Sequence, residues 1–176
     1  YDCGACQGNA PFWGGGNAYG NTTVADGSLQ VLKYDYDVLV LQGQLGASLA
    51  GLPLQLWADW ARNLAAGVEY DTAFGVGMML GRAADPKTWE AGLLYQSMGK
   101  DAMFAQLIDS DFAAGNTDGE GWALRLGYAP VKNVTLNAMF MMTRTNKDVA
   151  RVIGPDYAIG RNLDYDRMQL DVNYRF

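Results

Sequence analysis

DYDRMQLDVNYRF (residues 164–176) ends the chain on a strict alternation of apolar and polar residues. Read backwards from Phe176, every second side chain is apolar, at Tyr174, Val172, Leu170 and Met168. Successive side chains of a β-strand point to opposite faces, so this stretch predicts a strand with one apolar and one polar face. Such a strand suits the edge of a soluble sheet, or a sheet with lipid on one side and water on the other.

The composition excludes several classes of protein and leaves a membrane barrel possible. The chain of 176 residues is long enough for one domain with a sizeable core. No apolar run approaches the roughly 18 residues of a membrane helix, whereas barrel strands average to near-neutral hydropathy, as the mean of −0.10 does here. A net charge of −6 gives no sign of nucleic-acid binding. The absence of His removes serine-protease-type triads and most zinc or haem sites, so we expect no enzyme, cofactor or metal.

Six further runs with a period of two residues precede the closing strand. They lie at about 39–49, 54–61, 73–80, 89–96, 122–129 and 134–142, and none has the 3.6-residue period of a helix. Short turns at 51–53, 83–87 and 130–133 alternate with long connections at 64–71, 97–120 and 146–163. In an up-and-down sheet, alternate connections lie at opposite ends, so all short turns share one end with Phe176. This sorting is typical of outer-membrane barrels, with short periplasmic turns and long extracellular loops.

We therefore predict an all-β fold, a transmembrane antiparallel up-and-down β-barrel in the bacterial outer membrane, with about seven or eight strands in this chain. Residues 1–28 form a Gly-rich extracellular loop or N-terminal segment, and residues 29–176 form the barrel strands. Barrels of single bacterial chains have even strand numbers, and Ser28–Tyr36 is either an eighth strand or the outer end of a long first strand. The chain is either a complete barrel or the C-terminal part of a larger one. The loop-like start at Tyr1, without an initiator Met, favours the second.

The alternation also assigns side chains to the two faces. The polar face is expected to line the lumen through Gln42, Gln44, Gln55, Asp59, Glu90, Gln96, Arg125, Asn137, Arg167, Gln169, Asp171, Asn173 and Arg175. Aromatic girdles at the two membrane interfaces are expected from Trp60, Trp89, Tyr95, Trp122, Tyr128, Tyr174 and Phe176. The lumen charges have both signs, so they either set a transverse field that filters polar solutes or form ion pairs that stiffen the wall.

A few features depart from this pattern. Leu94, Met139 and Met141 fall on the polar face, where they either pack against an inserted loop or plug, or mark a β-bulge. The acidic connection at 109–120 lacks EF-hand spacing and is expected to fold over the pore mouth rather than to hold a cation. Cys3 and Cys6 are expected to form a small loop disulfide or to remain idle thiols.

Three stretches together resemble the C-terminal half of the putative porins of Gram-negative bacteria. They are GLPLQLWADWARN (51–63), the run from KTWEAGLLYQ to KNVTLNAMF (87–140) and the closing DYDRMQLDVNYRF. The resemblance covers most of residues 35–176. It implies a secreted precursor and a longer barrel with further N-terminal strands.

The expected function is passive diffusion of small hydrophilic solutes or ions through a water-filled lumen. The alternative is a structural scaffold or sleeve that holds a partner or plug in the outer membrane, and the lack of His argues against an outer-membrane enzyme. Expected partners are membrane lipid, the barrel-insertion machinery that reads a terminal Phe, and either further copies in a homo-oligomer such as a trimer or the missing N-terminal strands.

Overall fold

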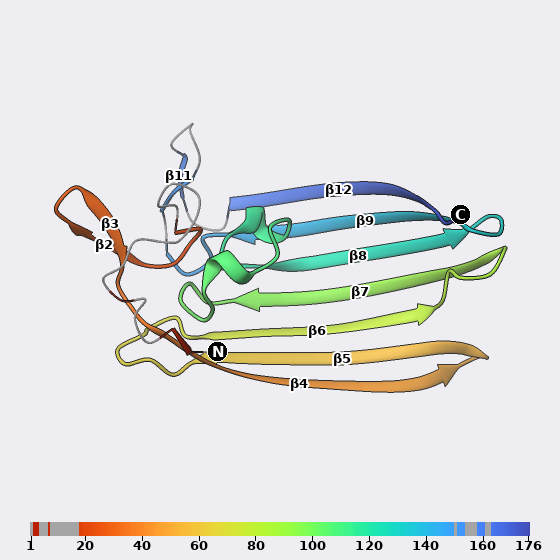
Figure 1. Ribbon diagram of the computed structural model, residues 1–176, viewed down its shortest axis with the longest axis horizontal. Helices are drawn as coiled ribbons and strands as arrows, with labels where there is room; N and C mark the ends of the chain where they lie inside the picture. Colours follow the sequence, from red (N-terminus) through yellow and green to blue (C-terminus); the bar gives the residue numbers. More distant parts are fainter. Residues whose placement is uncertain (1, 4–6, 8–17, 150, 154–157, 161–162) are drawn as a thin grey trace.

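Seven long antiparallel strands form one curved sheet in the structure, a computed structural model that describes residues 2–3, 7, 18–149, 151–153, 158–160 and 163–176 (Figure 1). These strands are β4 (Tyr36–Leu49), β5 (Leu52–Asn63), β6 (Thr72–Gly81), β7 (Thr88–Met98), β8 (Gly119–Ala129), β9 (Val134–Thr145) and β12 (Leu163–Tyr174). The predicted all-β, antiparallel up-and-down sheet is confirmed. Within the described residues, no helix has both the length and the apolar character needed to cross a membrane.

Each long strand pairs with its neighbours in the chain, and the sheet does not close on itself among the described residues. Its order is β1-β4-β5-β6-β7-β8-β9-β12, where β1 (Asp2–Cys3) pairs with only the start of β4. Because seven strands alternate in direction, the outermost long strands β4 and β12 run the same way. The described sheet is therefore open, with two long edges.

The pairing register is continuous across the seven long strands, and it therefore determines which side chains lie on each of the two faces of the sheet. Residues paired across an antiparallel sheet lie on the same face. One chain of partners runs from Gln42 through Asp59, Gly75 and Gln96 to Gly121. We call the face that carries these residues the polar face, and the opposite one the apolar face.

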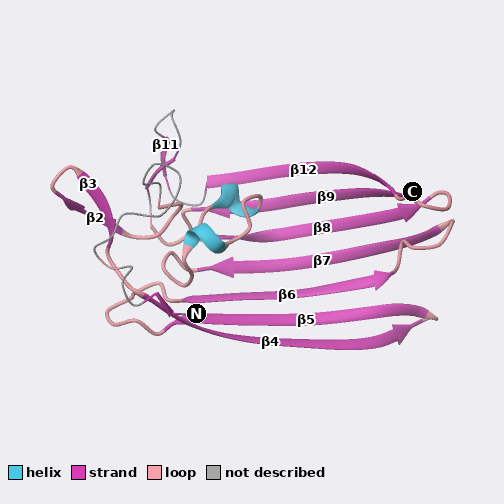
Figure 2. Ribbon diagram, viewed as in Figure 1, coloured by secondary structure: helices cyan, strands magenta, loops and turns pink. Residues whose placement is uncertain are grey.

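The two ends of the sheet differ in their connections. One end, the turn end, has tight links at 50–51, 82–87 and 130–133, and the other, the loop end, has connections at 64–71, 99–118 and 146–162. The loop-end connections include the short helices η2 (Ala105–Leu107) and η3 (Phe112–Gly115), shown in cyan in Figure 2, and the strands β10 (Arg151–Ile153) and β11 (Ala158–Gly160). The predicted alternation of short and long connections thus matches the structure.

The structure differs from the expectations at one turn and in the segment before the first long strand. The first turn is Ala50–Gly51 rather than 51–53. Both residues have positive φ (50° and 79°), as a two-residue turn of type I′ requires, and Leu52 already begins β5. Neither alternative for Ser28–Tyr36 holds for the whole segment: it adds no eighth strand to the sheet, and only Tyr36 belongs to the first long strand. Residues 29–32 form β3 (Leu29–Leu32), which pairs with β2 (Thr23–Asp26) in a separate hairpin. This hairpin spans the expected boundary between the N-terminal segment and the barrel strands at 28/29. The first long strand, β4, begins at Tyr36.

The strained turn residue offers a test of this boundary. Ala50 holds a left-handed conformation that costs an ordinary L-residue about 1 kcal/mol and that Asn tolerates better. We expect Ala50→Asn to raise the free energy of unfolding by about 0.5–1 kcal/mol. A urea titration measures this change, with Ser48→Asn, on the adjoining strand, as the control that gains nothing. A turn at 51–53 would instead make the two variants equivalent.

Candidate functional site: the polar face and the connection folded onto it

The residues predicted to face a lumen share one face of the sheet. The strand register places twelve of them on the polar face: Gln42, Gln44, Gln55, Asp59, Glu90, Gln96, Arg125, Asn137, Arg167, Gln169, Asp171 and Asn173. Arg175 follows the last residue of β12 and lines a depression of about 610 Å³ at the turn end together with Glu90 and Asn137. The sheet thus gathers amides and charges of both signs on one surface.

The apolar face carries an exposed hydrophobic band. Even in the central strands, Leu93, Leu124 and Leu126 remain 37–46% exposed, because no segment of the described chain covers this face. A contiguous exposed apolar surface of this kind marks contact with lipid or another protein.

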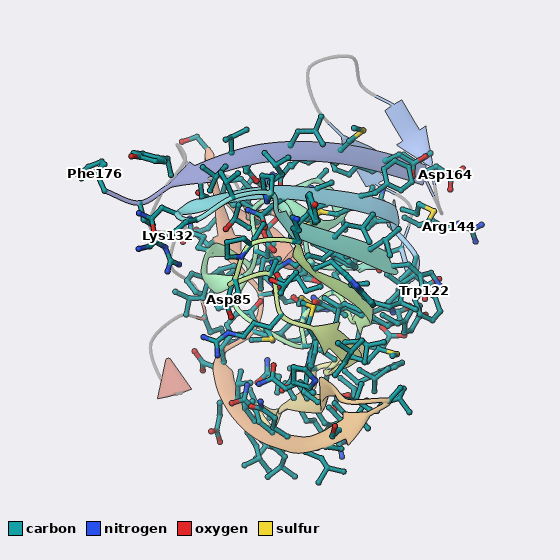
Figure 3. The ribbon with its side chains drawn as sticks, turned by 90° about the vertical axis from the view of Figure 1, so that its right-hand side faces the viewer. Asp85, Trp122, Lys132, Arg144, Asp164 and Phe176 are labelled. Carbon is teal, nitrogen blue, oxygen red and sulfur yellow. The ribbon has the colours of Figure 1, made fainter. Side chains whose placement is uncertain are left out.

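Aromatic side chains border this apolar band. Trp60, Tyr95 and Trp122 lie toward the loop end, whereas Trp89, Tyr128 and Tyr174 lie toward the turn end, with Phe176 just beyond β12. The rings of Tyr95 and Trp122 pack at 4.8 Å between centroids. Beyond Trp122 the same face becomes charged: Arg144 and Asp164 pair at 3.2 Å and lie on the same side of the sheet as Trp122 (Figure 3).

Glycines on the polar face let large side chains lie flat against the sheet. A side chain on Gly77 would collide with the indole of Trp57, and a Cβ on Gly92 would lie 2.8 Å from Cε of Met79. A Cβ on Gly127 would likewise lie 2.7 Å from Cγ of Glu90. Sequence reasoning missed these contacts, although the alternate glycines of strands β6 to β8 were a signal for them. Because the side chains of Trp57, Met79 and Glu90 lie over these glycines, they extend less far from the polar face.

The β7–β8 connection (residues 99–118) folds onto the polar face. Its helix η3 contacts β8 and β9, and its Phe112, 6% exposed, lines a cavity together with Leu94, Met139 and Met141. Pairing continues without interruption through Met139 and Met141, so the described strands have no bulge there. Of the two explanations left open for these inward apolar residues, packing against an inserted loop is the one that the structure supports.

An acidic residue anchors this connection to the last strand. Asp111 Oδ1 lies 2.7 Å from Arg167 Nη1, and Gln169 Nε2 donates a hydrogen bond of 2.6 Å to Asp111 Oδ2. Two residues predicted to face the lumen therefore hold the connection in place. Across the described residues, no group of three or more Cys, Asp or Glu side chains is arranged to hold a metal ion.

A buried polar group fixes the other half of the connection. Asp101, 1% exposed, accepts hydrogen bonds from the Thr22 N–H (2.7 Å), the Thr22 hydroxyl (2.5 Å) and the Tyr36 hydroxyl (3.1 Å). The Asn21 amide donates to the carbonyl of Met103 at 2.9 Å. These bonds join the segment before β4 to the β7–β8 connection. Beneath them lies the main apolar cluster, formed by Leu32, Tyr36, Val38, Ala61, Ala73, Met98, Ala102 and Phe104.

Asp118 links two loop-end connections. Its carboxylate accepts the N–H groups of Asp148 (2.7 Å) and Val149 (3.1 Å). Burial raises the pKa of Asp118 to about 6, and the neighbouring Asp148 charge adds to this, although the two N–H bonds oppose it. The disulfide predicted between Cys3 and Cys6 stays a prediction, because Cys6 lies outside the described residues.

Comparison with known proteins identifies the family. The family model described as "Putative porin" matches residues 30–176, which is most of the chain. The chain belongs to the putative porin family. The resemblance noted in the sequence is thereby confirmed, and membership of this porin family points to a channel or structural protein rather than to an enzyme. No curated protein and no solved structure matches the chain.

Loosening the anchor of this porin-family chain should free the β7–β8 connection. We expect Arg167→Gln to speed hydrogen–deuterium exchange of the amides at 111–117 about two- to fivefold, since a partly exposed ion pair contributes roughly 0.5–1 kcal/mol. Lys132→Gln, which removes a cation from an exposed turn, is the control. Equal exchange in both variants would show that the ion pair does not hold the connection.

The raised pKa of Asp118 makes its contribution to stability pH-dependent. Since the folded pKa of about 6 exceeds the ordinary 3.8, this group's stabilisation is complete below about pH 3.8 and is lost as the pH rises through about 6. Urea titrations at pH 4.5 and pH 8 measure how the free energy of unfolding changes between the two values, and Asp118 should contribute a loss at pH 8. Asp118→Asn, which cannot ionise, should lack this contribution, so its free energy of unfolding should fall less than that of the wild type. An equal fall in both proteins would show that another group is responsible.

Proposed function

We propose that this sheet is part of an outer-membrane β-barrel that works as a porin, allowing small hydrophilic solutes or ions to diffuse passively through a water-filled lumen. The observation that carries the proposal is the difference between the two faces. The apolar face suits lipid and is bordered by aromatic rings at both ends. The polar face carries amides and charges, which suit water.

The two open edges support closure by further strands. In lipid, every backbone N–H and C=O must be satisfied within the protein, so β4 and β12 cannot end the sheet inside a membrane. Because β4 and β12 run in the same direction, an antiparallel barrel needs an odd number of additional strands between them. The edge of β4 already has one short antiparallel partner, because β1 pairs with its start, Asp2 opposite Asp37, and this pairing supports closure by further strands.

The β7–β8 connection would narrow such a lumen. It covers part of the polar face near the loop end. Its Asp111 also pairs with Arg167, so the charge of Arg167 is balanced by the connection and not presented alone to the lumen. The other polar-face charges are Asp59, Glu90 and Asp171 against Arg125 and Arg175, and the ion pairs within the described part of the chain include none of them. Because acidic and basic side chains are present in nearly equal number, we expect the lumen to pass small polar solutes without strong preference for cations or anions.

A structural sleeve is the second candidate. It is favoured by the extent to which the chain's own segments cover the loop end of the polar face, with Tyr36 and Phe104 fully or almost fully buried there. A sleeve would hold a plug or partner in its lumen and conduct little.

Conductance separates the two functions. We expect the full-length protein, purified and inserted into planar bilayers, to give discrete conductance steps that a heat-denatured control lacks. Arg167→Gln should make the open current noisier because it frees the β7–β8 connection, and Lys132→Gln should leave the current unchanged. A folded, inserted protein without conductance would contradict the porin function and favour the sleeve.

A further inference from the structure

An apolar notch interrupts the polar face where the β7–β8 connection meets the sheet. It has a volume of about 160 Å³. Its apolar wall is formed by Trp57, Met79, Leu94, Phe112, Met139 and Met141. Most of these come from the strands, and Phe112 closes the notch from the loop side. The β7–β8 connection packs on this wall through Phe112 but leaves a cavity beside it. Apolar surface that faces water carries a free-energy cost, which burial against an apolar ligand would remove.

The rim of the notch carries polar groups. Arg125 lies beside Gly92 and Met139 in the strand register, and Gln96 also lines the notch. Arg125 is exposed, and none of the ion pairs of the described chain includes it. The one carboxylate at the rim, Asp109, already accepts the N–H of Asp111 at 2.8 Å. The rim thus offers the guanidinium of Arg125, which none of the described ion pairs includes, and the side-chain amide of Gln96.

We propose that the notch binds the ring of a small aromatic carboxylate while Arg125 pairs with its carboxylate, so that such solutes have a site along the lumen. The proposal rests on the porin function and names a substrate class for it. An apolar cavity of about 150 Å³ is large enough to accept benzene, and this notch is of that size. A guanidinium is the side chain that matches a carboxylate with two parallel hydrogen bonds.

Other solute classes fit the notch less well. Sugars would leave their hydroxyl groups unpaired against the apolar wall, which is costly. Organic cations would meet the charge of Arg125, and a short acid such as acetate would leave the apolar wall uncovered. A ring that carries one carboxylate matches both halves of the site.

The test is solute block in planar bilayers that contain the full-length protein. Benzoate, acetate and benzyl alcohol are added in turn, so that ring and charge are tested together and separately. We expect benzoate to interrupt the current at concentrations at least about tenfold lower than the other two need, because each lacks one half of the match. Similar block by benzoate and acetate, in a protein that conducts, would overturn the site and leave the porin function intact.

Variants locate the site. Arg125→Gln, a change at an exposed side chain, should weaken benzoate block about tenfold while leaving open-channel conductance measurable. Met139→Gln keeps the side-chain volume but makes the apolar wall polar, and should weaken benzoate block several-fold with little effect on acetate. Lys132→Gln, at the exposed turn, is the control that should keep wild-type block. Unchanged benzoate block in Arg125→Gln would contradict the proposal, whereas absence of conductance in the wild type would contradict the porin function itself.

Discussion

Backbone pairing across seven consecutive antiparallel strands is the constraint on which the rest of the structure depends. A shift of one residue between any two strands would move every side chain of one of them to the opposite face. The register is continuous from β4 to β12. It therefore assembles an apolar face and a polar face from short stretches that are far apart in the chain. It also leaves the described sheet open, with β4 and β12 as its outer long strands.

The β7–β8 connection gives the polar face its local character. Asp111 joins it to Arg167 and Gln169, Phe112 packs on apolar side chains of the wall, and Asp101 ties its first half to the segment before β4. Its position therefore rests on both charged and apolar contacts. This arrangement explains why apolar residues occur on a face that is otherwise polar: they are the surface on which the connection packs.

The sequence was sufficient to predict the strands, their faces and the sorting of connections, because alternation and turn residues are local signals. It could not predict which loop atoms meet the wall. The Asp111–Arg167 pair joins residues 56 positions apart, and nothing in either stretch specifies the other. The turn at Ala50–Gly51 was misplaced because Ala gives no sign of a positive φ. The Trp57–Gly77 contact depends on the pairing register of two strands, and the alternation within each strand leaves that register open.

The central claim, that one face of the sheet meets lipid and the other water, can be tested on a single strand. Spin labels are attached to cysteines placed one at a time at Leu170, Asp171, Val172 and Asn173 of the full-length protein, with Cys3 and Cys6 replaced by serine. In lipid vesicles, labels at 170 and 172 should be relaxed by oxygen, and those at 171 and 173 by a water-soluble nickel complex. The same accessibility at all four positions would contradict a sheet that separates lipid from water.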